Sequence, residues 1–321
     1  GVITAIQILF IVFAALVLLY TMLRSGAFDT LNRSFAEISE DRRIQIVLVA
    51  FFLATFIEGA AGFGTPAAVV APLLLGLGFP ALAAVVVALI GHVIAVTYGA
   101  VGTPVVVGIQ EPISSVSEIE ASIQAGGLTT TEFAVEVAVW AATYHALVGF
   151  VMPLFAVGMV VYFFGEERSL KPALEVAPFC LFAGVAFAIP YWLAAQVSAE
   201  FPALFGSMIG GAVVITLLNA GYFEPDSHWE FPPEEAWPDH WVGSIQPADA
   251  RGIVPSEYGM SPGRAWAPYV LLVVLLVATR GIDPLAELLQ GEAVEVLGVG
   301  LSLALGTITT GVGEITIGLF G

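Results

Sequence analysis

The sequence is short of positive charge and of cysteine. It holds nine Lys and Arg against 27 Asp and Glu, a net charge of −18, and Lys171 is its single lysine. Without a basic patch, nucleic acid is not expected as a partner. The lone Cys180 excludes a disulfide framework and a cysteine metal cluster. No H-E-x-x-H pair is present either, so we expect no metal and no cofactor.

Charge of either sign is also scarce, at 11% of residues, whereas a soluble domain carries about a quarter. Hydrophobic residues make up 58% of the chain, and the mean hydropathy is +0.94. Several windows exceed the roughly 18 apolar residues that a membrane helix needs. Such runs exclude a transmembrane barrel, whose strands alternate over about ten residues. The sequence therefore predicts an all-α polytopic membrane protein in contact with lipid.

One apolar run, from Ile44 to Leu77, is interrupted by Glu58 and by a glycine-rich segment that ends at Thr65-Pro66. A carboxylate at membrane depth is a functional candidate by default. Irregular backbone at that depth must be buried in protein or line a wet cavity. Thr65 as N-cap and Pro66 as the first helical residue predict a helix that starts inside the membrane.

A second break follows at Tyr98 to Pro104 and repeats the Gly-Thr-Pro pattern. Helix N-termini carry free N–H groups and partial positive charge, which suit an anionic ligand. Paired interruptions of this type are the best sequence pointer to a transporter site with discontinuous or re-entrant helices. Glycines in membrane helices also serve close packing, so that interpretation stays open for them. The candidate substrate-binding residues at the two breaks are Gly62, Gly64, Thr65, Gly102 and Thr103.

The stretch Glu58-Gly-Ala-Ala-Gly-Phe-Gly-Thr-Pro66, followed by Leu77-Gly-Phe-Pro80 and the Tyr98–Pro104 break, resembles the lactate permease family. The resemblance implies a multi-pass plasma-membrane carrier that moves L-lactate or glycolate together with protons. Glu58 is then the proposed proton-coupling or gating carboxylate. The chain begins at Gly1 in apolar sequence, so we expect residues 1–321 to be part of one transporter domain.

Three further residues are candidates, two within apolar runs and one, Arg280, directly after a short one. His92 and His145 can relay protons, or can be hydrogen-bonded packing residues. Arg280 suits bidentate recognition of a carboxylate, or can be a snorkelling or topogenic arginine. The last segment, Leu305 to Gly321, predicts a third break around Glu314, although it departs from the family pattern.

The positive-inside rule places the loops that hold the cations in the cytoplasm. These are Arg24–Arg43, Gly165–Lys171 and the acidic loop 223–263, with Gln110–Glu132 outside. The acidic, lysine-poor loops suggest a halophile, because high salt screens their repulsion, and an ordinary acidic protein is the alternative.

Two other functions remain open from the residues. The first is an intramembrane enzyme that uses Glu58, His92 and His145. The second is a truncated accessory membrane protein that transports nothing.

Overall fold

The computed structural model describes residues 9, 13–14, 17–18, 20–22, 24–223, 225, 227–242, 260–281, 294–296, 299–301, 304–310 and 313–318. The chain divides into two compact units, Gly1–Ala265 and Trp266–Gly321, which are considered separately. The apolar run from Ile3 to Leu23, which is long enough to span a membrane, lies mostly outside the described residues. The expectation of one transporter domain stays a prediction.

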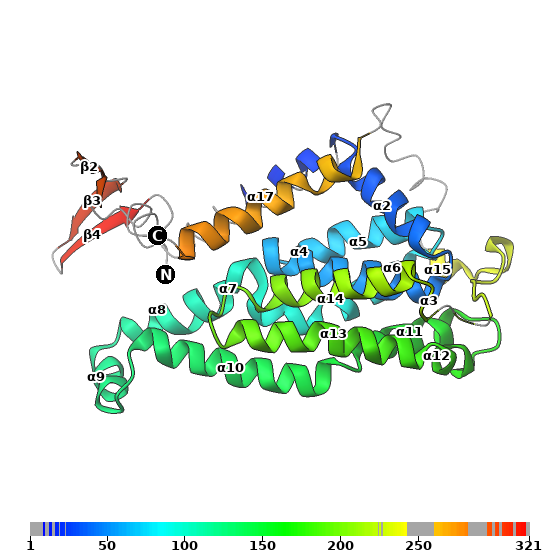
Figure 1. Ribbon diagram of the computed structural model, residues 1–321, viewed down its shortest axis with the longest axis horizontal. Coiled ribbons are helices and arrows are strands. Elements are labelled where there is room, and N and C mark those ends of the chain that lie inside the picture. The colour runs from blue at the N-terminus through cyan, green and yellow to red at the C-terminus, as the bar shows by residue number, and fades with distance from the viewer. Residues whose placement is uncertain are drawn as a thin grey trace. The chain divides into compact units, whose positions relative to one another are not determined.

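The first unit is helical (Figure 1). Its longer helices are α2 (Ala27–Ile38), α5 (Thr65–Gly76), α6 (Ala81–Gly91), α10 (Thr130–Gly149), α11 (Met152–Phe164), α13 (Ala177–Ala195) and α14 (Pro202–Asn219). Its shorter helices are α3 (Arg42–Gln45), α4 (Ala54–Ala61), α7 (Gly99–Val105), α8 (Glu111–Ser114), α9 (Ser117–Ala125), α12 (Lys171–Glu175) and α15 (Asp239–Val242). The described part of this unit also holds four π- or 3₁₀-helical segments, η1 (Ile46–Leu53), η2 (Val93–Tyr98), η3 (Val106–Gln110) and η4 (Glu234–Ala236).

The core is one apolar helix formed by α3, η1 and α4 without interruption, from Arg42 to Ala61. It is 20 residues long, and every residue from Arg43 to Ala61 is buried inside the protein. A helix that is apolar on all sides has no face for solvent, so it takes the centre of a bundle. Segment η1 contacts α5, α6, α11, α13 and α14.

After this central helix the chain turns at Gly62–Gly64 and returns through α5. Helix α5 has 12 residues, or about 18 Å, which is well short of the roughly 30 Å hydrocarbon layer. Its far end comes back to the start of the central helix, where the Arg42 guanidinium lies over the Phe79 ring, 5.9 Å from the centroid. The two segments therefore form a helical hairpin, and whether it is re-entrant stays a prediction.

The next segment crosses the bundle in pieces, through α6, η2, α7, η3 and α8. Helix α9 follows, and the chain returns through α10 and α11, which meet at a 43° bend. Four helices in the described residues are long and apolar enough to span a membrane, or five with this bent pair. The prediction of a helical polytopic membrane protein with discontinuous helices is confirmed.

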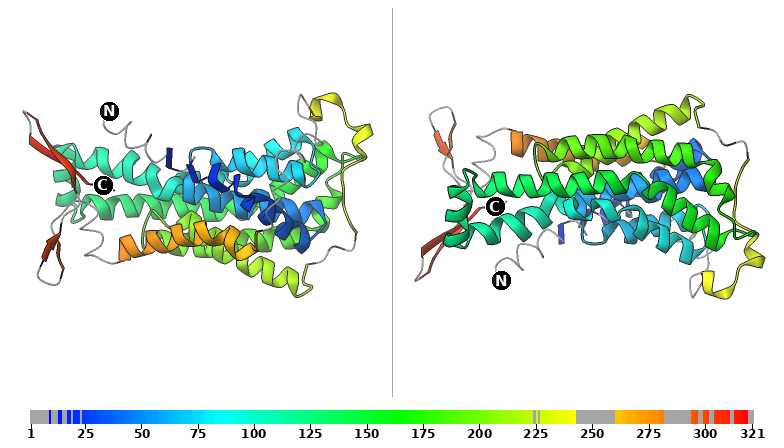
Figure 2. Two further views of the ribbon diagram at one scale, coloured as in Figure 1. Left: turned by 90° about the horizontal axis from the view of Figure 1, so that it is seen from above. Right: turned by 90° about the horizontal axis from the view of Figure 1, so that it is seen from below.

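Helices α10, α13 and α14 run side by side (Figures 1 and 2). Gly206 and Gly210 of α14 form the contact with α13. A Cβ at Gly210 would stand 2.7 Å from the carbonyl oxygen of Ala186, and one at Gly206 2.8 Å from the Tyr191 Cβ. The G-x-x-x-G spacing is typical of packing faces between membrane helices, and here it lets the backbones of α13 and α14 approach closely.

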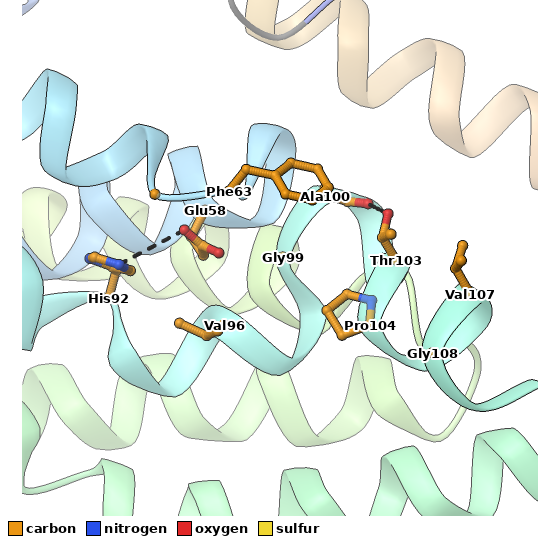
Figure 3. Close-up of a pocket in the computed structure, with 11 residues that line it drawn as sticks. Glu58, Phe63, His92, Val96, Gly99, Ala100, Thr103, Pro104, Val107 and Gly108 are labelled. Atoms are coloured by element: carbon orange, nitrogen blue, oxygen red, sulfur yellow. Dashed lines mark hydrogen bonds and ion pairs between the residues drawn. The ribbon is translucent and has the colours of Figure 1, made fainter. Parts of the chain in front are cut away.

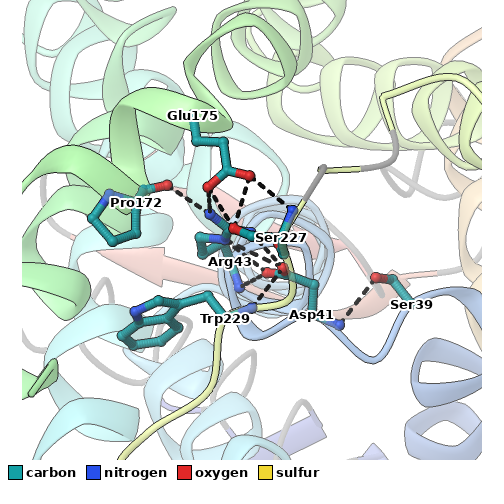
Figure 4. A network of polar contacts seen from close by, with 7 residues as sticks. All are labelled: Ser39, Asp41, Arg43, Pro172, Glu175, Ser227 and Trp229. Carbon is teal, nitrogen blue, oxygen red and sulfur yellow. Dashed lines mark hydrogen bonds and ion pairs between the residues drawn. The ribbon is translucent and has the colours of Figure 1, made fainter.

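At one end of the bundle, Arg43 ties three chain segments together (Figure 4). Its guanidinium makes an ion pair with Asp41 at 2.7 Å and another with Glu175 of α12 at 2.9 Å. It also donates to the carbonyl oxygens of Pro172 (2.8 Å) and Ser227 (2.5 Å). The loops that the cation pattern assigns to one side of the membrane therefore lie together. Which side they face stays a prediction.

The second unit holds the C-terminal part of α17 (Pro262–Gly281) and two antiparallel hairpins. Strand β1 (Val294–Val296) pairs with β2 (Val299–Leu301), and β3 (Ala304–Thr310) pairs with β4 (Gly313–Gly318). The predicted third helix break around Glu314 is therefore wrong. The alternation of Thr and Ile from 307 to 309 and from 315 to 317 is typical of a strand, and β-branched residues favour that conformation.

Candidate functional site

The two glycine-rich breaks meet inside the first unit. Gly62, which ends α4, packs against the second break so closely that a Cβ there would stand 2.7 Å from the amide nitrogen of Ala100. Gly62 also has a φ of +58°, which suits glycine. Sequence spacing alone did not establish this contact, although it identified both breaks.

The first break differs from the prediction in its cap. Helix α5 begins at Thr65, and its N-cap is Gly64, with a φ of +76° and no side-chain cap. The Thr65 amide donates to the carbonyl oxygen of Gly62 at 2.9 Å. Thr65 as N-cap is therefore wrong, because a left-handed glycine closes the turn one residue earlier.

The second break is a left-handed turn within α7. Ala100, Val101 and Gly102 have φ values of 44°, 57° and 76°, so right-handed helix resumes only at Thr103. The Thr103 hydroxyl donates to the carbonyl oxygen of Ala100 at 2.5 Å. Two non-glycine residues in this region cost free energy, and such strain is found at functional sites.

A cavity of about 590 Å³ lies where the breaks meet (Figure 3). Its lining is mostly apolar or backbone and contains no Arg or Lys among the described residues. The lining residues are Glu58, Phe63, Gly64, His92, Val96, Gly99, Ala100, Thr103, Pro104, Val107 and Gly108. The size and the few convergent polar groups are typical of a small-molecule site.

The two ionisable groups of the cavity face each other. Nε2 of His92 lies 3.9 Å from Oε2 of Glu58, which is close enough for an ion pair and too far for a hydrogen bond. Glu58 is only 3% exposed, and its Oε2 has no hydrogen-bond partner among the described residues. The carboxylate lies against Gly99, where a Cβ would stand 2.5 Å from Oε1.

His145 occupies a different place. Its Nδ1 lies 2.8 Å from the Tyr191 hydroxyl, which donates to the carbonyl oxygen of Ile94 at 2.9 Å. Tyr98 stacks edge-on against Tyr191, with centroids 5.3 Å apart, and its hydroxyl donates to the carbonyl oxygen of Ala138. His145 does not line the cavity and instead joins α10 to α13 and η2.

Of the residues expected to bind substrate, Gly64 and Thr103 line the cavity. Gly62 and Gly102 lie so close to neighbouring backbone that a side chain would not fit. A Cβ at Gly62 would stand 2.7 Å from the amide nitrogen of Ala100, and one at Gly102 2.5 Å from the carbonyl oxygen of Ala199. Thr65 is buried beside them. Arg280 belongs to α17 in the second unit, and its side chain lies outside the described residues.

Sequence reasoning missed Phe63, Val96 and Gly99 as lining residues. Gly99 lies inside the second break, so its position gave a usable signal. Phe63 has a φ of 51° in the first break and lies beside the cavity in Figure 3. Val96 gave no signal, because it belongs to an ordinary apolar run.

Residues 1–315 match the family model described as L-lactate permease. The chain belongs to the L-lactate permease family. This match includes most of the segment from Leu305 to Gly321, which departs from the family's motif pattern. No solved structure matches the chain.

The chain is similar to curated members of the family. It is 28% identical over 270 residues to the L-lactate permease of Bacillus subtilis, a stretch that covers 84% of this chain and 42% of that protein. It is 28% identical over 279 residues to glycolate permease GlcA of Escherichia coli, covering 84% and 43% respectively. The chain thus spans less than half the length of these relatives.

Proposed function

We propose that this chain forms the substrate-binding part of a plasma-membrane carrier for L-lactate, glycolate or a related 2-hydroxy monocarboxylate, moved together with protons. The meeting of two discontinuous helices at a cavity that holds the buried Glu58 side chain carries the proposal. The names of the permeases to which the chain is similar supply the substrate class.

The cavity offers the substrate several polar contacts. Gly64 and Thr103 lie at the starts of right-handed helix, where N–H groups and partial positive charge favour a carboxylate. The Thr103 hydroxyl uses its proton on Ala100, which leaves its oxygen free to accept from the 2-hydroxyl of the substrate. Phe63, Val96 and Val107 leave apolar room for a small methyl group.

Glu58 provides the link to protons. Ionised, it repels an anion in the cavity, and because the Glu58 side chain is buried that repulsion is screened less than in water. Protonation removes the repulsion, so that anion and proton are carried together. Three of the other candidates, Gly62, Thr65 and Gly102, hold the two breaks in place, and Arg280 stays a candidate carboxylate ligand from the second unit.

The placement of the histidines favours a carrier over an intramembrane enzyme. An enzyme that uses Glu58, His92 and His145 together needs the three side chains at one site. His145 is instead bonded to Tyr191, outside the cavity.

The test is uptake of radiolabelled L-lactate and glycolate by proteoliposomes, with an inwardly directed proton gradient and without one. The proposal expects saturable uptake of both anions that the gradient stimulates. Empty liposomes with the same gradient are the control for passive entry of the neutral acid. Uptake equal to that control would refute transport and favour the accessory-protein alternative.

A further inference from the structure

We infer that His92 binds the substrate carboxylate through Nε2 and that Glu58 is its resident counter-ion, which the substrate displaces. This assignment rests on the proposed function and names the charged group that receives the anion. Neither helix N-terminus provides a full positive charge, and no Arg or Lys lines the cavity among the described residues.

The orientation of the imidazole ring is fixed by its other nitrogen. Nδ1 of His92 lies 2.6 Å from the carbonyl oxygen of Ala88, one helical turn earlier, so Nδ1 carries a proton and donates it. A second proton can then bind only at Nε2, the atom that faces Glu58. His92 is the C-cap residue of α6, directly before η2. The chain changes there from α-helix to 3₁₀-helix.

The long distance between Nε2 of His92 and Oε2 of Glu58 allows a substrate carboxylate to take the place of Glu58 beside the ring. At 3.9 Å, Oε2 has no hydrogen bond from the ring and none from any other described residue. A buried carboxylate atom without a partner is costly, so this atom marks a site that is completed by a further group. A proton on Glu58 frees Nε2–H for another carboxylate.

Charge balance then couples proton and anion. The Nδ1 proton is fixed, so only Nε2 and the Glu58 carboxyl exchange protons. A Glu58–His92 pair that holds one proton on these two groups is neutral, whichever group carries it. A second proton makes the pair positive, and one bound monocarboxylate restores neutrality. Because uncompensated charge is strongly disfavoured in a buried site, the second proton and the anion enter together. The expected stoichiometry is one proton for each monocarboxylate.

Other titratable groups near the pair do not take this role. The Tyr98 hydroxyl is committed to the carbonyl oxygen of Ala138. The carboxylate of Glu200, whose Cα lies against Gly102, accepts a hydrogen bond from Ser198 and does not line the cavity. His145 is bonded to Tyr191.

The experiment measures binding of L-lactate and of its neutral isostere L-lactamide to the purified protein in detergent. His92→Gln should weaken L-lactate binding by about tenfold or more, the loss expected for a charge-assisted hydrogen bond, and leave L-lactamide binding within about twofold. His145→Gln is the matched control and should change the lactate-to-lactamide ratio by less than about twofold. Glu58→Gln should bind L-lactate at alkaline pH at least as tightly as the unmodified protein, because the competing carboxylate is gone.

Equal losses for lactate and lactamide in His92→Gln would overturn the assignment, since they would mark a packing residue. Unchanged lactate binding in that variant would overturn it as well. A protein with all residues intact that binds no L-lactate would instead refute the proposed function.

Discussion

Replacing Arg43 by Met should destabilise the protein far more than replacing the adjacent Arg42. The Arg43 side chain is fully buried and pairs with Asp41, whose side chain is 1% exposed. Removing one partner of a buried pair leaves an uncompensated charge, which costs about 3–5 kcal/mol. The lost hydrogen bonds to Pro172 and Ser227 contribute to the same effect.

Arg42 provides the matched control. It lies 3.9 Å from Glu230, whose side chain is 57% exposed, and such a pair contributes about 0–1 kcal/mol. Its position over Phe79 adds about 0.5–1 kcal/mol. Arg42 also donates to Oε1 of Gln45 at 2.9 Å, which adds about 1 kcal/mol, so the Arg42→Met variant should lose about 3 kcal/mol at most.

The assay is thermal unfolding of both variants in detergent, followed by tryptophan fluorescence. A double variant, Arg43→Met with Asp41→Asn, should recover part of the loss, because Asn removes the bare charge and still caps α3. If Arg43→Met melts no lower than Arg42→Met, the buried network does not stabilise this end of the bundle.

Three other predictions follow from the structure. Burial alone would raise the pKa of Glu175, but hydrogen bonds from Ser227 and Arg43 hold it below its usual value. The stability that its charge contributes is therefore present above the unfolded pKa of roughly 4.3 and is lost as pH falls through the lower folded pKa, so the melting difference from Glu175→Gln should shrink in acid. Gly99→Ala should weaken lactate binding with little change in melting temperature, because its Cβ meets the movable Glu58 carboxylate, whereas Gly91→Ala should unfold the protein more readily, because its Cβ would overlap the backbone carbonyl of Ala50. The eight acids and one arginine between Glu224 and Pro262 should make the protein more stable in molar salt than in dilute buffer, and equal melting temperatures would contradict a halophilic origin.

Sequence patterns predicted the helical membrane class and both breaks, because glycines, a proline and a carboxylate within an apolar run interrupt a membrane helix. They did not predict the N-cap of α5, since Thr65 and Gly64 both satisfy cap rules and only the backbone decides. The patterns also did not predict that His92 lies beside Glu58, 34 positions away in the sequence. Nor did they predict that His145 lies apart from both, bonded to Tyr191. Those outcomes depend on how α6, α10 and α13 pack, which local patterns do not contain. The strands near Glu314 were not predicted, because an apolar run in a membrane protein favours helix and outweighed the Thr-Ile alternation.

The measurement that tests proton-coupled transport most directly is L-lactate movement by Glu58→Gln in proteoliposomes. Glutamine keeps the shape and hydrogen bonding of a protonated carboxyl, so exchange of internal for external lactate should persist. Accumulation driven by a proton gradient should be lost, because glutamine cannot take up and release the proton that the Glu58 carboxyl carries. A Glu58→Gln protein that still accumulates L-lactate against its gradient would show that Glu58 is structural and that coupling lies elsewhere.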